Sequence, residues 1–166
     1  MGDFPIPSLN LFSIESIKKL EGREHRSVCR GRMDYLFVYG TLRARVSHPM
    51  HRVLRSHGQL DGLARFRGRL LDLGDYPAAV SDSSGTWEVV GELYRLQQSE
   101  PLLTQLDVYE GCAPESPHPQ EYRREHRMTM RANGGSVLAW IYIYNLPLVS
   151  PKWITSGDYL NRHGDG

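Results

Sequence analysis

The distribution of apolar and polar residues is typical of a chain built mainly from β-strands. In several short stretches, β-branched and aromatic residues either run together or alternate with polar residues, as in buried and half-buried strands. Asn133-Gly134-Gly135 separates the last two stretches and is a strong hairpin signal. Gly91 lies inside another stretch, where it marks either a bulge or a close approach of two backbones. Strands are predicted at residues 35–39, 63–73, 87–96, 122–130 and 137–144.

Two short helices interrupt this pattern. The first is predicted from Pro49, a residue that suits the first helical turn, to His57, which precedes Gly58. The second opens at Ser99, carries leucines at helical spacing and is closed by Gly111. Many strands with two short helices predict an α+β domain built on a strongly curved sheet or barrel.

The first part of the chain differs from the rest. Residues 1–32 combine an extended, proline-containing start, a short amphipathic helix after Ser13 and a polar, basic end, so they are interpreted as an N-terminal appendage. The main domain is predicted at residues 33–160, and residues 161–166 form a polar tail. An alternative interpretation is a module that binds a partner protein through the amphipathic helix.

Length and charge narrow the functional classes. The 166 residues fit one ordinary domain, and 20 Lys+Arg against 19 Asp+Glu give a formal charge of only +1. Such a chain has no net field to attract nucleic acid or an anionic membrane. The most apolar stretch, residues 137–149, is too short to span a bilayer. With two cysteines and no CxxC spacing, we expect a cytoplasmic protein that binds neither nucleic acid nor membrane.

Glu110 is the first candidate for chemistry. Leu103, Leu106 and Glu110 are spaced so that the carboxylate continues the apolar stripe that faces the core. Partial burial raises the pKa of a carboxyl group toward neutrality, as a general base and acid requires. The alternative is that Glu110 turns to solvent or accepts a hydrogen bond from a tyrosine.

The stretch LFVYGTLR, residues 36–43, is the second candidate, because a buried strand runs directly into a glycine turn. The N–H groups of Gly40, Thr41 and Leu42 can line a nest that binds a carboxylate or a developing oxyanion, and Thr41 adds a hydroxyl group. An ordinary strand-to-loop turn is the alternative.

Tyr122 and Arg124 are the third candidate. Side chains alternate along a strand, so these two point to one face and Arg123 points to the other. A phenol and a guanidinium on one face suit a polar substrate, and they equally suit the solvent face of an edge strand.

Other catalytic classes lack support in the sequence. GxSxG, HExxH, GxxxxGK[ST] and GxGxxG do not occur. The histidines, among them His48, His51 and His57, have no ligand spacing, so we expect exposed helix histidines and no metal site. Cys112 has no evident histidine partner and is interpreted as incidental.

Taken in order, these features resemble the gamma-glutamylcyclotransferase-like family. The resemblance implies a small mixed β-barrel flanked by short helices and covers roughly residues 35–159. The matching motifs are Tyr39-Gly40-Thr41-Leu42-Arg43, residues 71–80 (LDLGDYPAAV), Leu106-Asp107-Val108-Tyr109-Glu110-Gly111, Tyr122-Arg123-Arg124, residues 140–145 (WIYIYN) and Ser156-Gly157-Asp158-Tyr159.

The resemblance also assigns roles. It implies that Glu110 is the catalytic residue, that Tyr39, Gly40, Thr41 and Leu42 form the substrate-binding loop, and that the aromatic ring of Tyr122 lies near the substrate. Arg124 is a further substrate-binding candidate, with a structural role as the alternative.

The reaction implied is conversion of a γ-glutamyl amide to 5-oxoproline and a free amine or amino acid, with no cofactor. The α-amine attacks its own γ-carbonyl, so a fixed rotamer replaces a second reactant. The Thr-Leu form of the loop resembles members that act on γ-glutamyl amines. The identity of the leaving group is not assigned beyond an amine or an amino acid. The expected partner is this small molecule alone, bound by a monomer or weak homodimer. The main alternative is a protein of the same fold that binds a small carboxylate or amide without catalysis.

Overall fold

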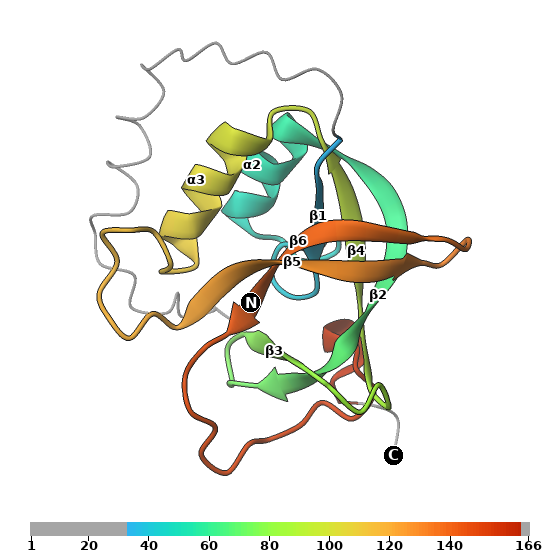
Figure 1. The fold of residues 1–166 in the computed structure, drawn as a ribbon, viewed down its shortest axis with the longest axis vertical. Helices are drawn as coiled ribbons and strands as arrows, with labels where there is room; N and C mark the ends of the chain where they lie inside the picture. Colours follow the sequence, from blue (N-terminus) through green and yellow to red (C-terminus); the bar gives the residue numbers. More distant parts are fainter. Residues whose placement is uncertain (1–32, 164–166) are drawn as a thin grey trace.

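Five strands close into a barrel in the computed structural model, which describes residues 33–163 (Figure 1). Neighbouring strands follow the order β2-β4-β1-β6-β5, and β5 pairs back onto β2. Strands β1 and β6 run parallel, whereas β2–β4, β1–β4, β5–β6 and β2–β5 are antiparallel. The prediction of a small mixed barrel in the α+β class is confirmed. The elements are β1 Tyr35–Val38, α2 Pro49–His57, β2 Gly58–Asp72, β3 Pro77–Ser81, β4 Glu88–Leu96, α3 Ser99–Tyr109, β5 Tyr122–Arg131, β6 Ser136–Tyr144 and the 3₁₀ turn η1 Tyr159–Asn161.

Strand β1 is buried on both faces, which explains its continuous apolar sequence. Leu36 and Val38 belong to the cluster that packs against the helices, whereas Phe37 and Tyr39 belong to a second cluster inside the barrel. Side chains alternate along a strand, so each face of β1 supplies one cluster. The strand therefore has no polar face, and its polar groups begin only where it ends.

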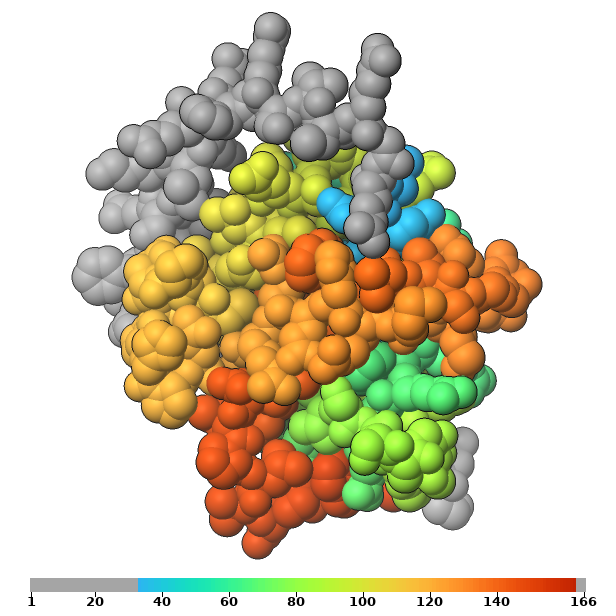
Figure 2. Space-filling model, viewed as in Figure 1, coloured from blue at the N-terminus to red at the C-terminus, as the bar shows by residue number. Residues whose placement is uncertain are grey.

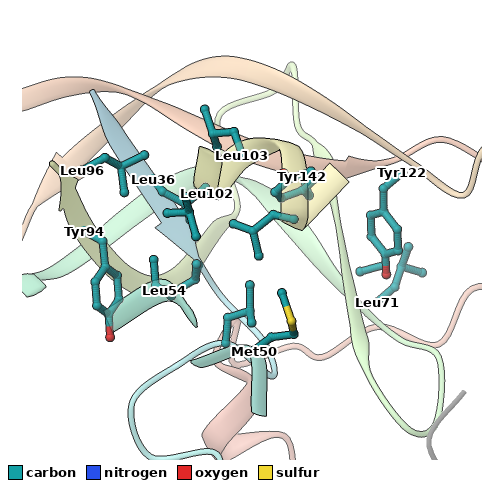
Figure 3. Close-up of a cluster of buried hydrophobic side chains, with 14 residues drawn as sticks. Leu36, Met50, Leu54, Leu71, Tyr94, Leu96, Leu102, Leu103, Tyr122 and Tyr142 are labelled. Carbon is teal, nitrogen blue, oxygen red and sulfur yellow. The ribbon is translucent and has the colours of Figure 1, made fainter. Parts of the chain in front are cut away.

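The two helices pack side by side on one face of the barrel (Figure 1). Leu54 of α2 and Leu102 of α3 are fully buried and meet Leu36 of β1 in the helix-side cluster (Figure 3). In the same view, Tyr122 and Leu71 lie together at the far side of this cluster. The apolar stripe of α3 is thus covered, as its sequence spacing predicted, and α2 also buries Met50 and Leu54.

Gly91 is a point of close approach. A β-carbon there would lie 2.4 Å from the carbonyl oxygen of Val38 and 2.6 Å from the ring of Phe37. The register of β4 against β2 shifts instead near Gly62, so the irregularity lies on the other strand. Of the two interpretations offered by the sequence, close packing is the one confirmed.

The β5–β6 hairpin and strand β2 account for the rest of the barrel. Gly134 and Gly135 adopt positive φ values of 98° and 82° at the hairpin turn, as predicted. This hairpin crosses the middle of the face seen in Figure 2, between α3 and β3. The stretch 63–73 is one part of the long strand β2, and the short β3, which follows Tyr76, was not predicted. Within residues 33–163, no helix is both long and apolar enough to cross a lipid bilayer.

Candidate active site

A pocket lies where β1 ends. It is lined by the run of residues 37–42 and, from other parts of the chain, by Tyr76, Pro77, Glu110 and Tyr142. The structure therefore brings two of the sequence candidates, the loop from Tyr39 to Leu42 and Glu110, into one cavity. Tyr76 and Tyr142 are lining residues that sequence reasoning did not single out.

The loop leaves β1 in a tight turn. The Arg43 N–H donates to the Gly40 carbonyl at 3.1 Å, so Thr41 and Leu42 occupy the centre of the turn. Within the described residues, the N–H groups of Thr41 and Leu42 donate to no protein acceptor. A β-carbon at position 40 would lie 2.7 Å from Cγ of Pro77, so only glycine fits at this point. The turn therefore places the N–H groups of Thr41 and Leu42 beside the pocket, and the anion-binding nest stays a prediction.

Arg43, the last residue of this turn, is held by two carboxylates. Its side chain is only 4% exposed, and Nη1 lies 2.6 Å from Oδ1 of Asp158 while Nε lies 3.4 Å from Oε1 of Glu92. The other carboxylate oxygen of Glu92 accepts the N–H of Ala44 at 2.8 Å. Two carboxylates, those of Glu92 and Asp158, therefore compensate the burial of the Arg43 charge.

A histidine holds the same loop. His51 is 9% exposed, and its Nδ1 lies 2.8 Å from the carbonyl oxygen of Leu42. Its ring also meets Tyr94 edge-on, with centroids 6.2 Å apart. The prediction of exposed helix histidines is therefore wrong for His51, because the first turns of α2 pack beneath the loop. Within residues 33–163, no cluster of three or more His, Cys, Asp or Glu side chains is placed to bind a metal ion.

Glu110 lies at the end of α3, where the chain reverses. Gly111 adopts φ 68°, and the Cys112 N–H donates back to the Asp107 carbonyl at 2.9 Å, which completes a Schellman-type helix end. This geometry turns the Glu110 side chain toward the pocket, at the end of the apolar stripe of α3. The carboxyl group of Glu110 and the turn therefore line the same pocket.

Burial is the main cause that raises the pKa of Glu110, which reaches about 8. The negative charges of Glu121 and Asp107 contribute to the same shift. Within the described residues, its carboxylate accepts no hydrogen bond from a tyrosine; the hydroxyl of Tyr142 donates instead to Asp107, at 2.8 Å. Glu110 can thus exchange a proton near neutral pH.

The tyrosines around Glu110 are hydrogen-bond donors rather than bases. Tyr39 Oη donates to the Tyr142 carbonyl at 2.7 Å and accepts the Ala79 N–H at 3.2 Å. Burial raises the pKa of Tyr39, Tyr122 and Tyr142, and the Glu110 charge adds to each shift. All three phenols therefore remain protonated at neutral pH.

Tyr122 and Arg124 lie outside the pocket lining. Tyr122 is 4% exposed and donates to the Pro77 carbonyl at 3.2 Å, so it supports the pocket wall from behind. The Arg124 guanidinium stacks 4.7 Å from the ring centroid of Trp140, and its Nη1 lies 3.5 Å from Asp107. Both side chains lie on the same side of β5, and neither lines the pocket.

Burial also changes the pKa of Cys112, which lies two residues after Glu110. It raises the pKa of the thiol to about 12, and the charges of Asp107 and Glu110 act in the same direction. The thiolate form is therefore scarce at neutral pH, which disfavours a nucleophilic role.

Comparison with known proteins relates the chain to a family. The family model described as gamma-glutamyl cyclotransferase, AIG2-like, matches residues 36–161. A Vibrio cholerae protein named "Putative gamma-glutamylcyclotransferase" is 39% identical over 129 residues, which cover 76% of this chain and 96% of that protein. Gamma-glutamylaminecyclotransferase of Rattus norvegicus is 28% identical over 150 residues, covering 81% and 92% of the two chains. The crystal structure of an aig2-like protein from Mus musculus aligns with a TM-score of 0.57 at 26% identity, over 71% of this chain and 81% of that one.

Proposed function

Because the chain belongs to the family described as gamma-glutamyl cyclotransferase, AIG2-like, we propose that it converts a γ-glutamyl amine to 5-oxoproline and a free amine. It is an enzyme of the gamma-glutamylcyclotransferase type, as its family and named relatives are. One observation in particular supports the formation of 5-oxoproline. Glu110, with its pKa raised to about 8, lines the same pocket as a turn with free N–H donors.

The reaction needs one group that moves protons. The α-nitrogen of the substrate begins as an ammonium group with three protons, and one of them remains on the ring nitrogen of 5-oxoproline. Glu110 takes the other two in succession and delivers each to the leaving nitrogen, which departs as an ammonium ion. A pKa near 8 suits both directions of this transfer.

The bonds change at the γ-carbon. The α-nitrogen attacks the γ-carbonyl carbon and closes a five-membered ring, and the bond from that carbon to the leaving nitrogen then breaks. A pocket that holds the folded rotamer supplies the effective concentration of the nucleophile. The free N–H groups of Thr41 and Leu42 are suited to the substrate carboxylate or to the oxyanion that forms during attack.

The charges around the pocket favour an amine as the leaving group. Glu110 lines the pocket, and Glu121 accepts a hydrogen bond at 2.8 Å from the lining residue Tyr76. Asp107 accepts one from the lining residue Tyr142, and Arg124 pairs with its other carboxylate oxygen. Among the described residues that line the pocket, none is lysine or arginine. A second carboxylate beside the scissile amide would be repelled. The relative named gamma-glutamylaminecyclotransferase supports the same choice.

The test uses two substrates that differ by one carboxylate. γ-Glutamyl-ethylamide and γ-glutamyl-alanine share the γ-glutamyl group and the two-carbon chain, so their kcat/KM ratio isolates the charge. We expect release of 5-oxoproline from both and a preference of about tenfold or more for the ethylamide, since like charges in a low-dielectric pocket repel by about 1–3 kcal/mol. A preference for γ-glutamyl-alanine would contradict the leaving-group assignment, and no 5-oxoproline from any γ-glutamyl compound would contradict the reaction.

A further inference from the structure

Three side chains connect the start of α2 to the pocket through hydrogen bonds. His48 Nε2 lies 3.3 Å from Tyr109 Oη, and Tyr109 Oη lies 3.4 Å from Thr41 Oγ1. The rings of His48 and Tyr109 meet edge-on, with centroids 5.3 Å apart. Thr41 lines the pocket, and Tyr109 directly precedes Glu110.

The helix cap fixes which nitrogen of His48 carries the proton. His48 is the N-cap of α2, and its Nδ1 accepts the N–H of Met50 at 3.2 Å. A ring nitrogen that accepts a hydrogen bond has no proton of its own, so the neutral imidazole carries its proton on Nε2. Partial burial lowers the pKa of His48, which favours this neutral form at pH 7.

The direction of the remaining hydrogen bonds follows from this tautomer. The Nε2–H group of His48 donates to Tyr109 Oη, so the phenol proton of Tyr109 is free to point at Thr41. Burial raises the pKa of Tyr109 to about 12, so the phenol keeps its proton. Thr41 Oγ1 then accepts from Tyr109, and its own proton must point elsewhere. Within the described residues, Thr41 Oγ1 has no other hydrogen-bond partner.

We propose that His48 and Tyr109 are positioning residues that commit the Thr41 hydroxyl to donate a hydrogen bond into the pocket. This role rests on the proposed function, because the acceptor is an oxygen atom of the bound γ-glutamyl substrate. The hydroxyl then adds a side-chain donor to the free N–H groups of the same turn. Because the hydrogen bonds from His48 to Thr41 run in one direction, Thr41 does not present a lone pair to the substrate oxygen.

The tautomer can be measured without any substrate. Long-range ¹H–¹⁵N NMR correlations of the full chain distinguish the two neutral forms of each imidazole, and His48→Asn identifies the signals of His48 by their loss. We expect the Nε2–H form at pH 7. Observation of the Nδ1–H form would overturn the proposal whether or not the protein turns over a γ-glutamyl compound.

Turnover then tests the consequence. His48→Asn keeps a cap, since asparagine is a strongly preferred N-cap residue, but removes the donor to Tyr109. Tyr109→Phe keeps the ring but removes the hydroxyl. Each variant should lower kcat for 5-oxoproline release by about 3- to 10-fold, the usual worth of one hydrogen bond. His57→Asn, at the other end of α2, serves as the matched control and should leave kcat unchanged.

A double-mutant cycle separates positioning from general structural damage. In a Thr41→Val background the donor is gone, so His48→Asn and Tyr109→Phe should have no further effect on kcat. Equal losses in both backgrounds, or no loss in the wild-type background, would overturn the proposal. If the wild-type protein releases no 5-oxoproline, the proposed function fails. The tautomer measurement still decides the direction of the hydrogen bonds from His48 through Tyr109 to Thr41.

Discussion

The raised pKa of Glu110 predicts that this residue destabilises the fold at neutral pH. Its pKa rises from an ordinary value of 4.5 to about 8 in the folded chain, because burial and two nearby carboxylates disfavour the charged form. The folded state therefore binds the proton more tightly than the unfolded state. The cost of ionising Glu110 is absent below pH 4.5, grows as the pH rises to 8 and is constant above 8.

The magnitude follows from linkage. Each unit of pKa difference corresponds to about 1.4 kcal/mol, so the cost at pH 7 is about 3 kcal/mol. Glu110→Gln keeps the shape and removes the charge. We expect the variant to be more stable than the wild type by about 2–3 kcal/mol at pH 7, with no gain at pH 4.

Urea denaturation at pH 4, 7 and 9 measures this difference. Glu100→Gln is the matched control for the loss of a carboxylate from the same helix, because Glu100 lies exposed in its first turn, and no such gain in stability is expected from it. A Glu110→Gln variant whose stability relative to wild type is the same at pH 4 and pH 9 would refute the assignment of a buried, proton-binding carboxyl group.

Four further predictions concern the loop and the chemistry. Arg43→Ala leaves Glu92 buried without its cation and should lower the free energy of unfolding by about 3–5 kcal/mol. Arg65→Ala removes a more exposed ion pair and should lower it by less than about 1 kcal/mol. Urea denaturation of both variants measures the difference. Gly40→Ala pushes the loop away from a proline only 2.7 Å from the new atom and should lower kcat/KM by about tenfold or more in the 5-oxoproline assay; unchanged kinetics would show that the loop shape is unimportant. Because Glu110 must be ionised to accept the first proton, kcat/KM should rise about tenfold per pH unit between pH 6 and 7 and level off near pH 8, and a flat profile would contradict this. Turnover should be the same with and without EDTA, and loss of activity that a divalent ion restores would reveal a metal site.

Local features of the sequence predicted most of the secondary structure. Turns such as Gly134-Gly135 and helix ends such as Gly111 depend on backbone conformations that few other residues adopt, so they can be read directly. The position of Glu110 on the apolar stripe of its helix was predicted for a similar reason, since three residues of that helix share the stripe. Whether the Glu110 side chain faces the core or the solvent could not be predicted, because this depends on the pocket beside the end of the helix.

Contacts between distant residues could not be predicted. Arg43 pairs with carboxylates 49 and 115 positions away, and no spacing rule connects them. His51 and Tyr142 belong to this class too: one meets a loop carbonyl, and the other enters the pocket from β6. Closure of the barrel through β2 and β5 depends equally on pairing across the fold. Long-range partners are therefore the part of the site that only the structure supplies.

In the proposed reaction, Glu110 carries the protons during the formation of 5-oxoproline. The most direct test measures kcat for 5-oxoproline release from γ-glutamyl-ethylamide by the wild type and by Glu110→Gln, with urea denaturation to show that both are folded. We predict a loss of about 1000-fold in the variant, within the range that general acid–base catalysis contributes. Activity of the variant within a few-fold of the wild type would contradict the claim and remove Glu110 from the mechanism.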